Sequence, residues 1–511
     1  MTRSENFPKW YQNIVAEADL AVSSPVRGCM IIRPNGYGIW ERIQYLLNKR
    51  IAETGHENLY FPVFIPLSFI AKEAEHVAGF AKEMAIVTHH RVKMDGGKLV
   101  LDPEAKLEEP LVVRPTSETI IGHHFRERVR SYTDLPLLWN QWANVVRWEM
   151  RTRLFLRTSE FLWQEGHTAH ADREDAMKET MRMLEVYRSF AQEDLAMPVV
   201  AGEKPPYDRF GGAERSFSIE AMMWDGKALQ AGTSHYLGTN FAVAQDIKYQ
   251  TKSNERSYCH TTSWGASTRL IGGLIMTHGD DDGLRTPPRI APRQIVVVPV
   301  LRNNPDDAGV LDYCDRLAVE LRAATFAGEP VRVLVDGRDG RWVDKRWAWI
   351  KRGAPVMCEI GGRDVQGDKV TFVRRDKPRT GDHIDSHTVS RESFVAGTTK
   401  LLQEIQDSLF AEAKARLDRD IVTNVKTLDD LQDYFGVAAE TEDADEALPP
   451  RGWVRVPWKK HSKDEAGPIL AVLKKRALSI RNAPLGQGAT AAPCIFTGAP
   501  ADEEVLIGRA Y

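Results

Sequence analysis

The sequence predicts a mixed α/β (α+β) protein with several domains, and three observations carry this prediction. At 511 residues the chain exceeds one typical hydrophobic core, so two to four domains are expected. Two runs, residues 145–150 and 154–164, flank a polar turn at residues 151–153 and predict two antiparallel strands. From residue 294 onward, strand and helix patterns alternate, which indicates a separate α/β domain.

Composition narrows the class of protein. Apolar residues make up 42% and charged residues 27% of the chain, which is ordinary for a globular protein. We expect no membrane span and no secretory signal, because no run of 18 apolar residues occurs and the N-terminal residues lack an apolar segment. The five cysteines include no CxxC pair, so the sequence favours a reducing cytoplasm over a disulfide framework or a zinc site. The net charge of -3 means that any RNA contact must come from local basic patches.

The N-terminal patterns predict a helix, a strand, a longer helix and a second strand, over residues 9–20, 24–34, 38–53 and 57–65. We expect Pro34 to end the first strand. Pro62 cannot donate to a sheet ladder, so the second strand is expected at an edge or interface. The histidine pairs at residues 89–90 and 123–124 could suggest a metal site, but adjacent side chains point apart and a structural role is favoured. His76 is also expected to be structural or on the surface.

A strand over residues 111–115 is predicted to lead into a helix that runs to about residue 129. Glu118 in the first turn of that helix has an ordinary explanation, because a carboxylate there stabilises the helix N-terminus. Alternatively, Thr116 and Glu118 could bind a small ammonium group at the end of the strand.

The run from Arg147 to His170 carries an unusual number of cations next to aromatic residues. The arginines are residues 147, 151, 153 and 157, and the aromatic residues among them include Phe161 and Trp163. A guanidinium group is a planar fork that fits phosphate oxygens and stacks on rings. The run therefore suits a nucleoside triphosphate, and a solvated arginine-rich hairpin is the alternative.

Two later segments combine small residues with directed hydrogen-bonding groups. Residues 227–238 hold Gln230, Thr233 and His235 among small residues, which permits close approach of a ligand, although a glycine-containing turn would look similar. Residues 259–273 place Trp264 and Gly265 before Arg269, which opens an apolar helix. A long helix is predicted over residues 172–195 and a strand followed by a helix over 214–225. Residues Asp280 to Asp282 are interpreted as a solvated loop and not as a magnesium site.

The C-terminal part begins with a proline-rich linker at residues 286–292. The predicted elements are strands at 294–300, 331–336, 356–360 and 370–374, and helices at 310–324, 344–352 and 401–417. Trp342, Trp347 and Trp349 lie near basic residues that include Lys345, Arg346 and Arg374, a combination that suits unstacked RNA bases. Residues 439–450 are expected to form a mobile loop.

The central run and its neighbours carry a family resemblance. Arg147-x-Glu149, a loop, and Arg157-Thr-x-Glu-Phe161 resemble motif 2 of class II aminoacyl-tRNA synthetases. The continuation Phe-Leu-Trp-Gln-Glu-Gly-His and the segment Arg-Pro-Thr-Ser-Glu-Thr at residues 114–119 resemble the prolyl-tRNA synthetase family in particular. The helix with the Pro62 strand resembles motif 1, and the segment ending at Arg269 resembles motif 3.

The resemblance implies a fold and an activity. It implies an antiparallel-sheet catalytic domain (1–286), an α/β anticodon-binding domain (287–400) and a linker helix with a small C-terminal α+β domain (401–511). The implied reaction activates L-proline with ATP and transfers it to the 3′ end of tRNA(Pro), with Mg²⁺ accompanying ATP, in a cytoplasmic homodimer. Only about 110 residues separate motif 2 from motif 3, which leaves no room for an editing domain between them. In this respect the chain resembles the archaeal and eukaryotic-like type of the family, which lacks that insertion.

The resemblance also implies roles for individual residues. The proline-binding residues would be Thr116, Glu118, Arg147, Trp163, His167, His235, Trp264 and Gly265. The ATP-binding residues would be Arg147, Glu149, Arg157, Thr158, Phe161, Gln230, Thr233, Ser267 and Arg269, with Arg147 and Arg269 as the catalytic pair.

The C-terminal part departs from the family pattern. Relatives often bind zinc there with four cysteines, but only Cys494 is present and Thr497 replaces a partner, so no zinc is expected. Ile350 and Gly362 replace residues that are usual in the anticodon-binding domain. The resemblance further implies that the carboxylate of Tyr511 folds back toward the active site. Two alternatives remain open: a catalytically silent paralogue that binds only RNA or protein, and a different class II synthetase such as the threonyl or glycyl enzyme.

Overall fold

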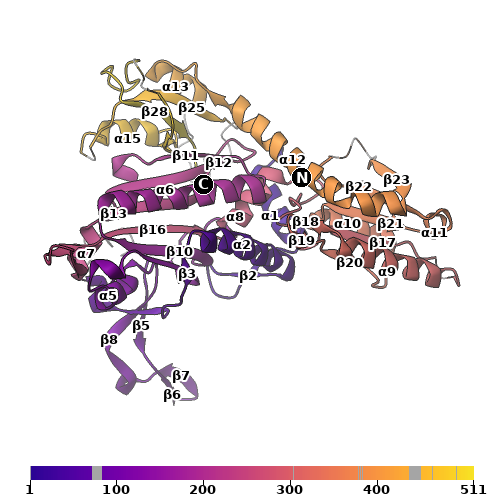
Figure 1. Cartoon of the computed structure of the whole chain (residues 1–511), viewed down its shortest axis with the longest axis horizontal. Coiled ribbons are helices and arrows are strands. Elements are labelled where there is room, and N and C mark those ends of the chain that lie inside the picture. Colours follow the sequence, from indigo (N-terminus) through magenta and orange to yellow (C-terminus); the bar gives the residue numbers. More distant parts are fainter. Residues whose placement is uncertain are drawn as a thin grey trace.

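An eight-stranded sheet forms the centre of the N-terminal part of the chain (Figure 1). The computed structural model describes the chain apart from residues 1, 72–82, 303, 378, 380, 382–383, 437–450, 463, 489 and 491. In order across the sheet, the strands are β27 (Ala483–Pro484), β11 (Val199–Glu203), β12 (Arg215–Met222), β13 (Ala228–Gly238), β16 (His260–Ser267), β10 (Glu160–His170), β9 (Leu137–Val146) and β3 (Glu57–Asn58). Neighbouring strands are antiparallel except β3 and β9. The predicted antiparallel sheet is confirmed.

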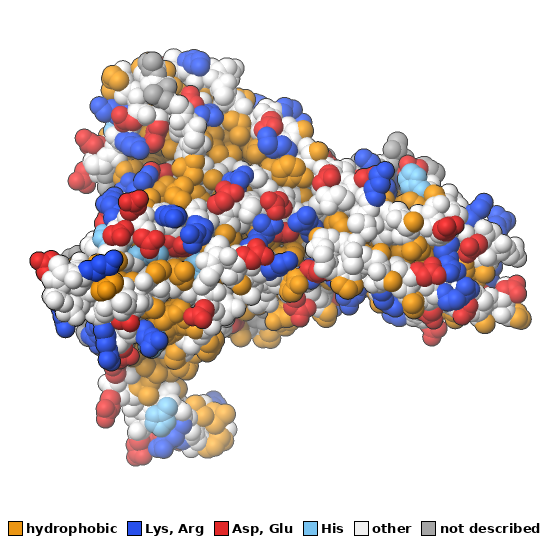
Figure 2. Space-filling model, viewed as in Figure 1, with side chains coloured by type: hydrophobic (Ala, Val, Ile, Leu, Met, Phe, Trp, Pro, Cys, Tyr) orange, Lys and Arg blue, Asp and Glu red, His pale blue; other side chains and the backbone are white. Residues whose placement is uncertain are grey.

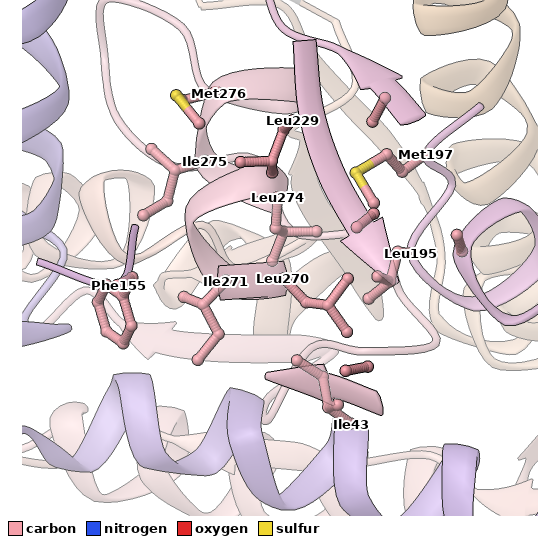
Figure 3. Close-up of a cluster of buried hydrophobic side chains, with 14 of the residues drawn as sticks. Ile43, Phe155, Leu195, Met197, Leu229, Leu270, Ile271, Leu274, Ile275 and Met276 are labelled. Carbon is pink, nitrogen blue, oxygen red and sulfur yellow. The ribbon is translucent and has the colours of Figure 1, made fainter. Parts of the chain in front are cut away.

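A single hydrophobic core joins this sheet to four helices. The helices are α1 (Phe7–Glu17), α2 (Pro34–Glu53), α6 (Arg173–Ser189) and α8 (Arg269–His278). Figure 3 shows the apolar side chains of α8 lying near Leu229 of β13 and Ile43 of α2. Leu270 and Leu274 of α8 are fully or almost fully buried. Burial of each such side chain stabilises the folded state by about 1.5–3 kcal/mol. This core fixes the start of α8, where Arg269 lies, against the strands.

Prolines change two predicted N-terminal elements. Pro34 is the first residue of α2, a position where its missing N–H is not needed. The predicted strand over 24–34 is therefore short, with β2 (Met30–Ile32) pairing to β1 (Ala21–Ser23). The predicted strand over 57–65 divides into β3 and β4 (Phe64–Pro66), with Pro62 between them. Both pieces lie at sheet edges, as expected from the proline.

A three-stranded sheet and a hairpin extend from the main body (Figure 1 and Figure 2). The sheet has the order β4, β8 (Lys106–Val113) and β5 (Ala85–His89), and the hairpin is β6 (Val92–Asp95) with β7 (Lys98–Leu101). Helix α3 (Leu67–Ala71) lies beside the sheet, and α5 (Glu118–Arg128) lies next to α3. The ring of His123 stacks on Phe69 and that of His124 on Trp139. Among the described residues, no cluster of three or more His, Cys, Asp or Glu could hold a metal ion; His76 lies outside them.

The segment 214–225 is a strand and a turn, and the predicted helix within it is wrong. Strand β12 ends at Met222, and Gly226 with φ of 78° closes a tight turn into β13. The long helix predicted over 172–195 forms as α6, followed by the π-helical turn η3 (Phe190–Asp194). Short elements complete this part of the chain: η1 (Pro103–Ala105), η2 (Tyr132–Asp134), η4 (Pro206–Asp208), α7 (Asn240–Gln245), β14 (Lys248–Gln250) and β15 (Arg256–Tyr258).

Asp280 is buried and paired, which corrects the expectation that residues 280–282 form a solvated loop. The guanidinium group of Arg375 donates to both carboxylate oxygens of Asp280, at 2.8 and 3.0 Å. Asp282 pairs with Arg379 at 3.1 Å. The acidic run is therefore a contact between the N-terminal sheet and the following domain.

The region after residue 294 is an α/β unit with a mixed five-stranded sheet. Its order is β20 (Val333–Val335), β17 (Ile295–Pro299), β21 (Val356–Ile360), β22 (Lys369–Arg374) and β23 (Ser386–Ser390). The first three strands are parallel and the last two are antiparallel. The helices are α9 (Asp307–Ala323), α10 (Trp342–Arg352), α11 (Gly362–Gly367) and α12 (Arg391–Asp420), and β18 (Thr325–Phe326) forms a small hairpin with β19 (Glu329–Pro330). The predicted strand–helix alternation is confirmed.

Only part of the predicted cationic and aromatic surface is accessible. Trp349 is buried, and its indole N–H donates to Asp336 at 2.8 Å, so it is a core residue. Lys345 is also buried. The guanidinium group of Arg346 lies 5.1 Å from the ring centre of Trp342 and 6.0 Å from that of Trp347.

The C-terminal region follows α12 and has its own core. Its sheet has the order β24 (Ile421–Val422), β25 (Trp453–Trp458), β28 (Glu503–Gly508) and β26 (Ser479–Ile480), with helices α13 (Leu428–Phe435) and α15 (Gly467–Lys474). Cys494 is buried and forms no disulfide. The expected loop over 439–450 lies outside the described residues. Over the part of the chain that the structure describes, no helix combines the length and the apolarity that a membrane span requires.

Candidate active site

A cavity of about 410 Å³ opens on the eight-stranded sheet. Most of the predicted site residues line it: Thr116, Glu118, Arg147, Phe161, Trp163, His167, Gln230, Thr233, His235, Trp264, Gly265, Ser267 and Arg269. They come from the start of α5 and the segment that leads into it, from the residue after β9, from β10, β13 and β16, and from the start of α8. Residues far apart in the sequence therefore meet on one surface.

The strand register explains why alternate residues of β10 face the cavity. Trp163, Glu165 and His167 project from one face of β10, because side chains alternate along a strand. Glu165 lies opposite Gly265 of β16, and Gly265 in turn lies opposite Thr233 of β13. The missing side chain of Gly265 leaves room above the centre of the sheet.

Trp264, one of the expected proline-binding residues, borders the cavity with its strand and not with its ring. Its indole ring lies 4.9 Å from the ring of His56 and 6.3 Å from Tyr187 of α6. A Cβ atom at Gly166 would meet this indole at 2.0 Å. The ring is therefore on the helix-covered face of the sheet, and only the strand at Trp264 borders the cavity.

One side of the cavity is acidic. The hydroxyl group of Thr116 donates to the carboxylate of Glu118, and both residues are buried. Arg147 donates from Nε to the carbonyl oxygen of Pro115 at 2.9 Å. Burial lowers the pKa of Arg147, while the charges of Glu118 and Glu165 oppose this shift. Two carboxylates and a guanidinium group thus lie side by side, an arrangement that can hold an amino acid by both its charged ends.

Glu165 organises the floor of this acidic side. Its carboxylate accepts hydrogen bonds from Ser117 at 2.5 Å and Gln141 at 2.8 Å, and it bonds to His167 Nε2 at 2.9 Å. Burial alone would raise the pKa of Glu165, but these hydrogen bonds lower it below the ordinary value. Burial alone would lower the pKa of His167, but Glu165 and the charge of Glu118 raise it. The pair is an ionised carboxylate next to a proton-holding imidazole.

His235 has the opposite electrostatic character. Its Nδ1 lies 2.9 Å from the hydroxyl oxygen of Ser216, and its ring stacks on Phe210 with ring centres 4.9 Å apart. Burial, together with the charges of Lys204 and His167, lowers the pKa of His235 to about 3. His235 is therefore a neutral hydrogen-bonding group at physiological pH.

The other side of the cavity is cationic. Arg269 donates from Nε to the carbonyl oxygen of Leu156 at 3.2 Å. Burial and the nearby charges of Arg157 and Arg147 lower the pKa of Arg269 to about 10. Ser267 accepts a hydrogen bond from the Arg269 N–H at 3.2 Å. Arg147 and Arg269 are partly buried and Arg157 is exposed, and a cluster of guanidinium groups that repel one another is suited to a polyanion such as a triphosphate.

Glu149, Arg157 and Thr158 do not line the cavity. They lie in the loop of residues 147–159, which replaces the expected three-residue turn at 151–153. Phe155 adopts φ of 62° and is buried in the core, so this loop is long and anchored. The Thr158 hydroxyl donates to the Glu160 carbonyl at 2.7 Å, and Glu149 accepts from the Arg151 N–H at 2.9 Å. The side chains of these two residues are thus engaged within the loop.

Sequence reasoning missed several lining residues. Glu165 could have been found from its alternation with Trp163 and His167. The others are Lys204, Asp208, Arg209, Phe210 and Gly211 between β11 and β12, together with Ser263, Ala231, Gly232 and Ala266. The segment 204–211 carries no recognisable spacing, so nothing in the sequence marked it. In the structure, Lys204 contacts Gln230 at 3.0 Å and Asp208 at 2.9 Å.

Comparison with known proteins places this geometry in a family. Residues 101–278 match the family model of the tRNA synthetase class II core domain (G, H, P, S and T), and residues 294–401 match the anticodon binding domain. A proline–tRNA ligase from Sphingopyxis alaskensis is 58% identical over 513 residues, covering all of this chain and 95% of the relative. The chain belongs to the proline–tRNA ligase family. Other members of the family are similar over their full length: the ligase from Sphingomonas elodea is 57% identical over 99% of its length, and that from Bdellovibrio bacteriovorus is 51% identical over 98%.

Proposed function

We propose that this chain is a proline–tRNA ligase that activates L-proline with ATP and transfers it to tRNA(Pro). The observation that carries the proposal is the position of Arg147. This partly buried guanidinium group is close enough to Glu118 and Glu165 on the acidic side, and to Arg269 on the cationic side, for their charges to act on one another. A group in that position can contact the carboxylate of an amino acid and the α-phosphate of ATP together.

The proposed reaction has two steps. A carboxylate oxygen of proline attacks the α-phosphorus of ATP, the bond to the β-phosphate oxygen breaks, and pyrophosphate leaves. The 3′-terminal hydroxyl group of the tRNA then attacks the prolyl carbonyl and AMP leaves. Neither step needs a covalent protein nucleophile, so catalysis consists of positioning and charge neutralisation. Loss of one guanidinium group from the phosphate side is expected to cost about 3 kcal/mol, by analogy with loss of an oxyanion donor.

Individual roles follow from the two sides of the cavity. For proline, Thr116 and Glu118 would bind the imino group. Trp163, His167 and Gly265 would border the ring, together with the strand backbone at Trp264. His235 would form a hydrogen bond as a neutral imidazole. For ATP, Arg147, Arg269, Gln230, Thr233 and Ser267 would contact the phosphates or sugar, and Phe161 would stack on the base. Glu149, Arg157 and Thr158 are proposed to act through the loop that carries them, Arg157 by the charge it places near Arg269.

Magnesium is proposed to enter with ATP as part of the substrate. The described residues hold no cluster of three or more ligating side chains for a resident ion. Mg²⁺ bound to a nucleotide needs only one or two carboxylates from the protein. Glu220 of β12 lies near Arg269, but it is fully buried, pairs with Arg481 and does not line the cavity, so the triphosphate itself would hold the ion. The residues present therefore fit a magnesium ion that is held mainly by the triphosphate. Such an ion would neutralise part of the phosphate charge.

The proposal includes the rest of the assembly. The chain would form three domains in a cytoplasmic protein. The first, residues 1–286, would bind proline and ATP, and the second, residues 287–400, would bind the anticodon. The third, residues 401–511, would lie on the acceptor side of the tRNA. The resemblance of α2 and the Pro62 strand to motif 1 supports a homodimer. Tyr37 and Tyr45 on α2 are 43% and 50% exposed, which is unusual for large aromatic residues and suits an interface between two copies. Sedimentation equilibrium of the full chain tests the dimer directly.

The test of the function is amino-acid-dependent ATP–pyrophosphate exchange, followed by aminoacylation of a tRNA(Pro) transcript. We expect exchange with proline in the wild type and a loss of at least about 100-fold in Arg147→Ala. The matched control is Arg173→Ala, because Arg173 is an exposed cation in α6 whose ion pair with Glu214 contributes little. Exchange with another amino acid would point to a different class II synthetase. No exchange at all, in protein with a normal melting curve, would favour the silent paralogue.

A further inference from the structure

A second cavity, of about 230 Å³, lies away from the active site, between α2 and the β18–β19 hairpin. Figure 1 shows α2 adjacent to β18 and β19, where the N-terminal sheet meets the α/β unit. Five cations line this cavity: Arg42, Lys49, Arg50, Arg289 and Arg332. We name this cavity, defined by these five residues, the basic cleft. Its lining includes three carboxylates, those of Glu53, Asp194 and Glu329.

Two of these carboxylates are each shared between two guanidinium groups. Asp194 pairs with Arg50 at 2.7 Å and with Arg289 at 3.2 Å. Glu329 pairs with Arg42 at 2.8 Å and with Arg332 at 3.2 Å. A single negative charge cannot neutralise two cations, so each shared pair leaves positive charge at the cleft.

The remaining acids reduce this surplus without removing it. Glu193, next to the cleft, pairs with Arg50 at 2.7 Å, and Glu53 is part of the lining. Lys49 forms no ion pair with any residue that the structure describes, and it is exposed. The basic cleft therefore keeps a net positive charge, with Lys49 available at its surface.

The arginines of the cleft are also incompletely hydrogen-bonded. The Nε atoms of Arg42 and Arg289 are buried and have no hydrogen-bond partner among the described residues. A buried donor without an acceptor is destabilising. Burial and the nearby charge of Arg42 lower the pKa of Arg332 to about 10, which shows how closely the cations are crowded. An anion in the cleft would accept hydrogen bonds from these guanidinium groups, and its negative charge would reduce the repulsion between them.

We propose that the basic cleft binds a phosphate group. Guanidinium forks match the spacing of phosphate oxygens, and a lysine adds a mobile point charge. The cleft lies between the two parts of the chain that carry the aminoacylation chemistry and the anticodon-binding fold. Two sources of the group have the same chemistry: a phosphodiester of bound RNA, and a free phosphorylated small molecule. Binding at the basic cleft does not depend on the proposed activity of the first cavity.

The first experiment titrates inorganic phosphate into the full chain by calorimetry, with the active site blocked by a non-hydrolysable prolyl-adenylate analogue. We expect phosphate affinity to fall at least fivefold in Lys49→Gln, which breaks no ion pair, and further in Arg289→Gln. The control is Lys9→Gln, an exposed lysine of α1 outside the cleft. Equal phosphate affinity in the wild type, Lys49→Gln, Arg289→Gln and the control would overturn the proposal.

A second experiment separates the two sources. The affinity of a tRNA(Pro) transcript is measured against salt concentration for the wild type and for Lys49→Gln. If the ligand is RNA, the slope of log K against log salt decreases by about 0.7–0.9 in the variant, the value for one lost phosphate contact. If phosphate affinity falls while this slope does not change, the ligand is a small molecule. Proline-dependent pyrophosphate exchange, which needs no tRNA, should be unchanged in Lys49→Gln, so a failure of the basic cleft and a failure of the active site are distinguishable.

Discussion

Arg481, from the C-terminal region, donates two hydrogen bonds to the buried carboxylate of Glu220, at 2.8 and 3.1 Å. Glu220 lies on β12 opposite Gln230, and Gln230 lines the active-site cavity. Burial is the main cause of the lowered pKa of Arg269, and the charges of Glu220 and Arg481 both act on it as well. The C-terminal region thus contributes a charged group next to the proposed ATP site.

We predict that Arg481→Ala impairs the use of ATP more than that of proline. The variant leaves the Glu220 carboxylate buried and unpaired, and loss of one partner of a buried pair costs about 3–5 kcal/mol. The expected result is a lower melting temperature and at least a tenfold fall in kcat/KM for ATP in pyrophosphate exchange, with KM for proline changed less than threefold. Arg481→Lys should restore part of the ATP effect. Arg455→Ala, which breaks the half-exposed pair with Glu504, is the control and should have little effect.

A second prediction concerns the Glu165–His167 pair and pH. The folded pKa of His167 is raised, so its protonated form stabilises the protein below the unfolded pKa, and this contribution is lost as pH rises through the folded pKa. Glu165→Gln removes the charge that favours the protonated imidazole. We expect the variant to lose this pH dependence and to show a higher KM for proline, measured by exchange at several pH values. A wild-type melting temperature that rises with pH between 6 and 9 would contradict the assignment.

A third prediction tests the aromatic contact at the proline side. The ring of Phe210 stacks on His235, at an angle of 27° between planes. Stacked aromatic pairs contribute about 0.5–1.5 kcal/mol beyond buried area, so Phe210→Ala should raise KM for proline roughly twofold to tenfold, the factor that this energy corresponds to. Phe210→Tyr keeps the ring and should stay close to the wild type. An unchanged proline KM in Phe210→Ala would remove Phe210 from the substrate site.

A fourth prediction concerns the contact between the N-terminal sheet and the α/β unit. Burial alone would raise the pKa of Asp280, but the charge and hydrogen bonds of Arg375 lower it. A lowered carboxylate pKa stabilises the protein above the unfolded pKa, and this contribution is lost as pH falls through the folded value. Asp280→Asn should therefore lower the melting temperature at pH 7 and reduce the wild-type loss of stability below pH 4. Asp281→Asn, at a neighbouring exposed carboxylate, should melt nearly as the wild type does.

The residues of the cavity that could be predicted are those in short, regular segments. Trp163 and His167 alternate on one strand, so local periodicity is enough to place them on a common face. Thr116 and Glu118 stand on either side of the N-cap residue of one helix, so their closeness in sequence is enough to bring them together. The same periodicity could have identified Glu165. Arg269 could be predicted for a similar reason, because an apolar helix begins at that residue.

The errors came from long-range contacts that no local pattern contains. Asp280 is buried because of Arg375, which lies 95 residues later in the sequence. The loop 147–159 is long because Phe155 is anchored in the core with a left-handed backbone. The segment that carries Phe210 reaches the cavity only because β11 and β12 place it there. The hydroxyl group of Tyr511 donates to Asp225 at 2.6 Å and its ring lies 5.9 Å from the guanidinium group of Arg153, while the approach of its carboxylate to the active site stays a prediction.

The pairing of β27 with β11 has a consequence for synthesis on the ribosome. The other seven strands of the main sheet are complete by residue 267, yet the edge strand β27 is translated more than two hundred residues later. Until then, the edge of β11 is unpaired, and exposed strand edges are sites of aggregation. The nascent chain must therefore keep that edge protected while the α/β unit and α12 emerge, and Arg481 reaches Glu220 only in the same late step.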